Sequence, residues 1–193
     1  MPRGVLKGVR AVATSPTKIE EFRRVLLELA KRGFLPAQAI VEVPELLRGF
    51  GKPVYDTEKC YGCASCTVQC LGEALRLVET NDRRKIYMDY WKCVACEECA
   101  IKCPKEAIKV EKVFDLRAFL SDEPLLIVDV ELMRCVICGR PISSTKQVDE
   151  VRELMKPLPI SQVHIERIRL LCENCKKLVA AKILLRSRGI KVE

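Results

Sequence analysis

The chain has 193 residues, of which 49% are apolar and 31% charged, so it is long enough for one globular core or for two small domains. This composition excludes collagen-like, mucin-like and wholly disordered proteins. Twelve cysteines stand beside only 5% aromatic residues, and cysteines in such number serve either in disulfides or as metal ligands. The formal net charge of +8, taken alone, favours a nucleic-acid partner.

The first residues favour metal over disulfides. Met1 to Thr14 interleaves Arg3, Lys7 and Arg10 with short apolar pieces, whereas a secretory signal needs an apolar stretch of roughly 7 to 15 residues. The longest apolar runs, such as Leu125 to Val128, are far shorter than the roughly 20 residues of a membrane span. We therefore expect a cytoplasmic protein, and in a reducing compartment cysteines bind metal.

The first predicted element is an amphipathic helix from Lys18 to Arg32. Its apolar residues recur at helical spacing, Thr17 and Glu20 form a capping box, and Gly33 ends the helix. We assign residues 1–50 to an N-terminal docking segment that carries this helix to a partner; alternatively, the helix covers its own domain. An extended connector is expected from Val43 to Pro53.

An internal repeat follows at an offset of 33 residues. Tyr55 to Cys60 aligns with Met88 to Cys93, and Glu73 to Leu77 aligns with Glu106 to Val110. Each copy predicts a strand, a cysteine loop, a short helix and a second strand. Two copies packed about a pseudo-twofold axis would make an α+β, bicluster ferredoxin-like domain over residues 51–112.

The turn at Asn81-Asp82 separates the copies. The basic run Arg83-Arg84-Lys85 that follows it is interpreted as a solvated hairpin tip.

Both copies contain the run C-x2-C-x2-C-x3-C, whose soft thiolates suit an iron-sulfur cubane. In two-cluster proteins the fourth cysteine of such a run ligates the other cluster. This rule predicts cluster A at Cys60, Cys63, Cys66 and Cys103, and cluster B at Cys93, Cys96, Cys99 and Cys70. A pair of zinc knuckles is the alternative. The first copy departs from the usual pattern, in which proline follows the fourth cysteine: Leu71 follows Cys70, whereas Pro104 follows Cys103.

Metal binding changes the meaning of the net charge. Four thiolates around a core of charge 2+ net about −2, so three such sites lower the charge from +8 to about +2. The positive excess lies outside the repeat, since residues 54–112 hold ten basic and ten acidic residues.

The C-terminal part contains a third cysteine system. Residues 113–130 are predicted to be a connector with a strand-like piece after Pro124, and residues 131–193 a zinc-ribbon-like domain. Two C-x2-C pairs far apart in the sequence, which we call hooks, have the spacing of a closed tetrahedral site for one zinc ion. Mononuclear iron at the same site, or thiols without a metal, are the alternatives. These ligands are Cys135, Cys138, Cys172 and Cys175.

Two helices are expected in this domain. Val148, Val151 and Met155 mark an amphipathic helix that ends before Pro157, and a terminal helix runs from about Lys177 to Arg188.

Single residues carry less information. His164, the only histidine, stands between Val163 and Ile165 in a strand-like context, which favours a packed or hydrogen-bonded role over a ligand role. Trp91 and Tyr61, beside cysteines, either shield a cluster from water or simply pack in the core. The sequence contains no phosphate-binding glycine motif and no catalytic triad, so no catalytic residue is nominated.

The cysteine pattern resembles a known family. Gly51-Lys52-Pro53 ahead of the first run, Cys103-Pro104 at the end of the second, and the later C-x2-C hooks resemble the two-cluster ferredoxin-like subunit of complex I relatives. The third cysteine system makes the chain most similar to the version in formate hydrogenlyase and other energy-converting NiFe hydrogenases.

This resemblance implies a bicluster ferredoxin fold, two 4Fe-4S clusters held by the eight cysteines of the repeat, and a peripheral position on the cytoplasmic side of a membrane. It also implies partners: a NiFe hydrogenase-like small subunit, other subunits of a membrane-associated complex, and a formate dehydrogenase or a ferredoxin as electron donor.

The sequence thus predicts an electron-transfer subunit of an oxidoreductase complex, without a catalytic site of its own. One alternative is a metal-bearing interaction module, such as a zinc-ribbon nucleic-acid or transcription-complex component. No nucleic-acid partner is expected, because the corrected charge is low and stacking aromatics are lacking. A free-standing ferredoxin is disfavoured by the roughly 130 residues outside the cluster domain.

Overall fold

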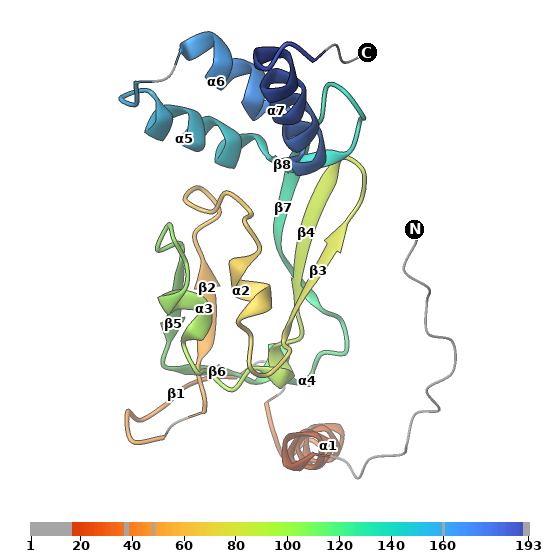
Figure 1. Ribbon diagram of the computed structural model, residues 1–193. Coiled ribbons are helices and arrows are strands. Elements are labelled where there is room, and N and C mark those ends of the chain that lie inside the picture. The colour runs from red at the N-terminus through yellow and green to blue at the C-terminus, as the bar shows by residue number, and fades with distance from the viewer. Residues whose placement is uncertain (1–16, 37–38, 48, 160, 191–193) are drawn as a thin grey trace, which may run out of the picture.

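The computed structural model describes residues 17–36, 39–47, 49–159 and 161–190, so the segment from Met1 to Thr14 lies outside the described residues. Strands and short helices alternate along the chain (Figure 1). In chain order they are α1 (Lys18–Lys31), β1 (Ile40–Glu42), β2 (Lys52–Tyr55), α2 (Ser65–Val68), β3 (Leu75–Glu79), β4 (Arg83–Met88), the 3-10 helix η1 (Tyr90–Lys92), α3 (Glu98–Ile101), β5 (Ile108–Glu111), β6 (Val113–Asp115), α4 (Leu116–Leu120), β7 (Leu125–Arg134), β8 (Pro141–Ser144), α5 (Thr145–Met155), α6 (Gln162–Arg169) and α7 (Glu173–Ser187).

The elements are stacked in three levels (Figure 1). Helices α1 and α4 lie at one end with β1 and β6, the cysteine loops and their strands lie in the middle, and α5, α6 and α7 lie at the other end. Strand β7 runs beside β4 from the level of α4 to β8, and so joins the middle level to the three C-terminal helices.

All strand pairs of the described residues are antiparallel. The outer strands β2 and β5 of the two copies pair with Tyr55 opposite Ile108, and the inner strands β3 and β4 pair with Leu75 opposite Met88. The inner pair continues into a four-stranded sheet of order β3-β4-β7-β8. The mixed strand and helix content agrees with the predicted α+β class, and each copy has the predicted order of strand, cysteine loop, helix and strand.

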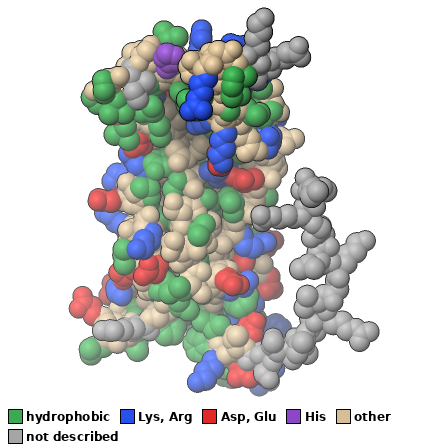
Figure 2. Space-filling model, viewed as in Figure 1, with side chains coloured by type: hydrophobic (Ala, Val, Ile, Leu, Met, Phe, Trp, Pro, Cys, Tyr) green, Lys and Arg blue, Asp and Glu red, His purple; other side chains and the backbone are tan. Residues whose placement is uncertain are grey.

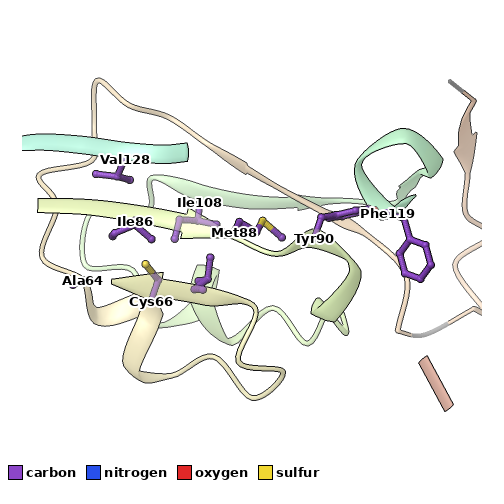
Figure 3. Packing of buried hydrophobic residues seen from close by; sticks show 9 residues of the cluster. Ala64, Cys66, Ile86, Met88, Tyr90, Ile108, Phe119 and Val128 are labelled. Atoms are coloured by element: carbon purple, nitrogen blue, oxygen red, sulfur yellow. The ribbon is translucent and has the colours of Figure 1, made fainter. Parts of the chain in front are cut away.

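The main core lies between the cysteine helices and β4. Ile86 and Met88 occupy alternate positions of β4 and therefore point to the same face. Figure 3 shows Tyr90 continuing this row, with Cys66 facing it from α2 and Val128 packing from β7. All five side chains are buried, so the cysteine loops are part of the hydrophobic core and not an appendage to it.

The basic run after the turn is not a solvated hairpin tip, as the sequence predicted, because it forms the first half of β4. Arg83 pairs with Asp129 of β7 at 2.8 Å. Arg84, only 14% exposed, donates to the carbonyl of Gly62 at 2.6 Å and pairs with Glu79. The run lies between β3 and β7, where its charges meet Glu79 of β3 and the sequence-distant Asp129 of β7.

Residues 113–130, predicted to be a connector, form β6, α4 and the first part of β7. Strand β6 pairs with β1 from the N-terminal segment. Four of the five phenylalanines pack together at this end of the molecule, three pairs edge to face and one pair tilted, with ring centroids 5.0–6.4 Å apart: Phe22, Phe50, Phe114 and Phe119. The N-terminal segment and these later residues therefore share one packed layer.

The predicted helix from Lys18 is confirmed, with its capping box: Glu20 N–H donates to Thr17 Oγ1, and Thr17 N–H donates to Glu20. Ile19 and Leu26 pack against the main core. Arg23 donates to the carbonyls of Phe119, Leu120 and Ser121, which end α4, and its guanidinium lies 5.2 Å from the Trp91 ring centroid. One face of α1 thus covers its own domain.

We expect Arg23→Ala to lower the free energy of unfolding by about 2–3 kcal/mol, because three carbonyl acceptors at the end of α4 lose a charged donor. Arg24, the exposed neighbour on α1, provides the control, and Arg24→Ala should change stability by no more than about 0.5 kcal/mol. Anaerobic urea unfolding of the metal-loaded chain measures both. Equal stability of the two variants would contradict an anchoring role for Arg23.

The C-terminal level contains the two predicted helices. Helix α5 ends at Met155 before Pro157, as predicted, and α7 begins at Glu173, earlier than predicted. The strand-like context predicted for His164 is wrong, because this residue lies in helix α6. His164 is exposed at the surface (Figure 2), so a packed role is wrong, whereas a hydrogen-bonded role stays a prediction. Among the described helices, none combines the length and the apolar character that crossing a membrane requires.

Candidate metal centres

The backbone of the two cysteine loops repeats at the same 33-residue offset as the sequence. The described residues other than glycine that have positive φ are five, all in these loops: Ala64, Glu73, Ala95, Glu97 and Glu106. Ala64 corresponds to Glu97, Glu73 to Glu106, and Gly62, with φ of 70°, to Ala95. A left-handed conformation costs about 1–2 kcal/mol outside glycine, and such strain concentrates at functional sites.

Each run of cysteines ends in the same hydrogen bond. The N–H of Ala74 donates to Cys70 Sγ at 3.3 Å, and the N–H of Ala107 donates to Cys103 Sγ at 3.3 Å. The intervening turns place Glu73 and Glu106 in the left-handed region. Backbone donors of this kind stabilise the negative charge on a ligating thiolate.

Glycine is required where the two loops approach each other. A Cβ on Gly72 would collide with the carbonyl oxygen of Lys92, just before the second run. A Cβ on Gly51 would lie 2.9 Å from Val110 and 3.1 Å from Ala95. The first loop at Gly72, and the residue before β2 at Gly51, can therefore pack this closely on the second copy only without side chains.

Three cysteines of the second copy share a cavity with one of the first. Cys70, Cys93, Cys96 and Cys99 line a mostly apolar cavity together with Pro53, Tyr55, Met88 and Val110. Burial raises the pKa of Cys93 to about 11, the N–H of Ala95 lowers it, and the neighbouring Cys99, Cys70 and Cys96 raise it further. The thiol of Cys70 therefore lies with the second run.

The other four cysteines of the repeat are also neighbours, three from the first run and one from the second: Cys60, Cys63, Cys66 and Cys103. Burial raises the pKa of Cys66 to about 12, with further contributions from Cys60, Cys63, Cys99 and Cys103. Burial also raises the pKa of Cys60, as do Cys103 and Cys63.

The cavity and the thiols around it fit an iron-sulfur cluster. Buried thiols with raised pKa values stay protonated unless a positive centre stabilises the thiolate. Soft sulfur ligands around a mostly apolar cavity suit iron-sulfur chemistry better than they suit hard cations. Cys96 is exposed, so one edge of this cavity reaches the protein surface.

Comparison with known families agrees with this geometry. Residues 59–107 match the family described as the 4Fe-4S dicluster domain, over both runs of four cysteines and about a quarter of the chain. This segment is therefore similar to a 4Fe-4S dicluster domain, and we call it the dicluster domain. No curated protein matches the chain. The predicted iron-sulfur, ferredoxin-type character of the repeat is thereby confirmed.

The other four cysteines of the chain form a separate, tight group outside the dicluster domain. The Sγ atoms of Cys135, Cys138, Cys172 and Cys175 all lie within 4.8 Å of one another. The first hook is the turn between β7 and β8, closed by Cys135 N–H donating to the carbonyl of Arg140 at 2.8 Å, with Gly139 at φ of 69°. The second hook begins α7, and Val136 N–H links the hooks through the carbonyl of Leu170.

The donor set of this group suits a single cation. A tetrahedral zinc with Zn–S bonds of about 2.3 Å separates its sulfur ligands by about 3.8 Å, and Cys138 Sγ lies 3.5 Å from Cys172 Sγ. Burial opposes ionisation of Cys135, but the N–H groups of Cys172, Cys138 and Ile137 outweigh it and bring its pKa to about 6. Burial and the crowded neighbouring thiols raise the pKa of Cys175 to about 12. Four thiolates are stable this close together only around a positive ion.

Two predicted neighbours of the cysteines have structural contacts. Trp91 lies in η1, half-buried beneath Arg23 and Lys92. The Tyr61 ring centroid lies 6.0 Å from the Lys105 ammonium. The backbone carbonyl of Tyr61 accepts a hydrogen bond from the Ser144 hydroxyl. Shielding of a cluster by either residue stays a prediction.

Sequence reasoning missed other residues that contact the first cysteine loop. Arg84 donates to Gly62, and Lys146 at the start of α5 donates to the carbonyls of Thr57 and Glu58 at 3.3 and 3.4 Å. Nothing in their sequence neighbourhood distinguishes these basic residues from solvated ones. Tyr55, which lines the cavity of Cys93, could have been noticed because its counterpart in the second copy is Met88.

Proposed function

We propose that this chain is an electron-relay subunit, which passes single electrons between two 4Fe-4S clusters within a larger oxidoreductase complex. Cluster A would be held by Cys60, Cys63, Cys66 and Cys103, and cluster B by Cys93, Cys96, Cys99 and Cys70. Iron-sulfur clusters bound in this way exchange one electron at a potential set by the surrounding protein. The crossed association of cysteines within the dicluster domain is the observation that carries the proposal.

The arrangement of the helices supports transfer between the two sites. Cys66 lies in α2 and Cys99 in α3, and these two short helices contact each other. The two thiols are close enough for Cys99 to raise the pKa of Cys66, after burial and the nearer cysteines. At the other side of its site, Cys96 is exposed, which supports electron exchange with a partner at that edge.

The four-cysteine group would hold one zinc ion as a structural centre. Its sulfur atoms are spaced for a single ion, and a closed shell of four thiolates leaves no position for a substrate. The core around it is small, with Leu171 buried beside three of the cysteines and Ile142 and Val179 packed against them. A metal would therefore supply much of the stability of this zinc-ribbon-like unit.

The complex would be a relative of complex I, closest to the energy-converting NiFe hydrogenases. The resemblance of both cysteine systems supports this assignment, as does the presence of two cluster sites on one chain. Its partners would include a NiFe hydrogenase-like small subunit, with a formate dehydrogenase or a ferredoxin as donor. The chain would then lie peripherally on the cytoplasmic side of the membrane. Val25 on the outer face of α1 is 54% exposed, which supports contact with such a partner.

An anaerobic redox titration of the purified chain, followed by electron paramagnetic resonance, tests the relay. We expect two reversible one-electron transitions per chain, together with about eight irons. Clusters without reversible redox activity, combined with salt-dependent binding to nucleic acid, would favour the metal-bearing interaction module instead.

The assembly is tested by anaerobic affinity purification of the tagged chain from its native cells, with identification of the proteins that co-purify. A hydrogenase-like small subunit is the expected partner. Recovery of the chain alone would favour the free-standing ferredoxin.

A further inference from the structure

Tyr55 places a buried hydroxyl group at the cluster cavity. It is the last residue of β2, paired with Ile108 of β5, and its side chain lines the cavity formed by Cys70, Cys93, Cys96 and Cys99. The hydroxyl oxygen is buried and has no hydrogen-bond partner among the described residues. Buried polar groups in native proteins are almost always hydrogen-bonded, so an orphaned hydroxyl calls for a missing acceptor.

The surroundings of Tyr55 indicate that this acceptor is sulfur. Glu97, the one carboxylate of the lining, pairs with Lys112 at 3.5 Å. Apart from Glu97, Tyr55 and the cysteines, the residues that line the cavity have apolar side chains or none. The pKa of Tyr55 is raised strongly, first by burial and then by Cys66, Cys99, Cys93 and Cys70. A tyrosine hydroxyl, with an ordinary pKa of about 10, is protonated at neutral pH and can therefore donate a hydrogen bond. The cysteines that line the cavity place sulfur atoms beside it.

The hydroxyl also breaks the symmetry of the repeat. The residue 33 positions later is Met88, which is 2% exposed and has no donor. The terminal N–H donors of Ala74 and Ala107, in contrast, are the same in both copies. Tyr55 therefore makes the surroundings of the two cluster sites different.

We propose that the Tyr55 hydroxyl donates a hydrogen bond to a sulfur of the cluster held by Cys70, Cys93, Cys96 and Cys99, and thereby raises its reduction potential. A reduced cluster carries one more negative charge than an oxidised one, so the donor stabilises the reduced form more. The hydrogen bond would consequently shift the electron equilibrium towards cluster B. This inference rests on the proposed function, because it requires that the clusters are present.

The test compares Tyr55→Phe with the wild-type chain in anaerobic redox titrations followed by electron paramagnetic resonance. Removal of the hydroxyl alone should lower the potential of cluster B and leave that of cluster A in place. We expect about a ten-fold change in the electron equilibrium between the clusters, which corresponds to about 59 mV for one electron. Tyr55→Met introduces the residue that the second copy has at the corresponding position. This second variant should lower the potential of cluster B by the same amount.

Tyr90→Phe is the matched control. Its hydroxyl is also largely buried, but it donates to the carbonyl of Val113 at 3.4 Å and accepts from the N–H of Asp115 at 3.3 Å. Its loss should lower stability without changing either potential. A shift of the same size in Tyr90→Phe would overturn the inference, because it would then report general loosening of the core.

The outcomes separate this inference from the proposed function. Wild-type chains without reversible clusters would overturn the electron relay itself. Normal clusters with unchanged potentials in both Tyr55 variants would overturn only the role of the hydroxyl. Loss of the clusters from both variants would also overturn it, because the hydroxyl would then serve assembly and not the potential.

Discussion

Replacing Cys103 by alanine is expected to damage cluster A, which is anchored by Cys60, Cys63 and Cys66 in the other copy of the repeat. The thiol of Cys103 contributes to the raised pKa values of both Cys60 and Cys66, so it lies with the first run although it belongs to the second. A site with three thiolates binds its cluster incompletely. Iron content should fall from about eight per chain to between about four and seven, while cluster B keeps its spectrum.

The mirror variant Cys70→Ala is the matched control for this prediction. Cys70 lines the cavity of Cys93, Cys96 and Cys99, and each of the two fourth cysteines accepts one N–H, from Ala74 or Ala107. The local disturbance is thus the same, but the damage should fall on cluster B. Electron paramagnetic resonance of both variants, prepared anaerobically, identifies the affected cluster. If Cys103→Ala damaged cluster B and spared cluster A, the crossed assignment would be wrong.

Replacing Cys172 by alanine should remove the zinc ion and unfold the C-terminal helices. Elemental analysis should find about one zinc per wild-type chain beside about eight irons, and in the variant almost no zinc with the iron unchanged. Structural zinc contributes about 10–16 kcal/mol in zinc-finger peptides, whereas the small core here offers little else to hold α7 on β7 and β8. Helix content should fall accordingly in circular dichroism.

Leu178→Ala provides the control in the same helix. Leu178 is 62% exposed, so its truncation should leave the zinc content and the helix content near those of the wild type. Finding a ninth iron and no zinc in the wild-type chain would instead favour a rubredoxin-like mononuclear iron site.

Much of this protein follows from local sequence. The capping box of Thr17 and Glu20 begins α1 where the sequence predicts, because capping depends only on residues three positions apart. The stop of α5 at Met155 has an equally local cause in Pro157. The spacing of cysteines in each run identified the dicluster domain, since a loop of that length must bring its three thiolates together.

The tertiary structure decided what depends on partners distant along the chain. Arg83 to Lys85 has the composition of a solvated tip, but pairing with β7, more than 40 residues later, makes it the middle of a sheet. His164 stands between two apolar residues in sequence, and only the packing of α6, where Ile165 is the buried residue, turns the histidine to solvent.

The N-terminal helix and Tyr55 show the same division at the candidate site. The periodicity of the sequence predicts the apolar face of α1. What this helix packs against depends on carbonyl groups at the end of α4, about a hundred residues away, which accept hydrogen bonds from Arg23. Tyr55 is one aromatic residue among nine tyrosines and phenylalanines in the sequence, and the burial of its hydroxyl among cysteines from both copies arises only when β2 pairs with β5. Helix starts and ligand loops are short-range and therefore determined locally, while strand pairing and buried donors depend on contacts that the fold alone creates.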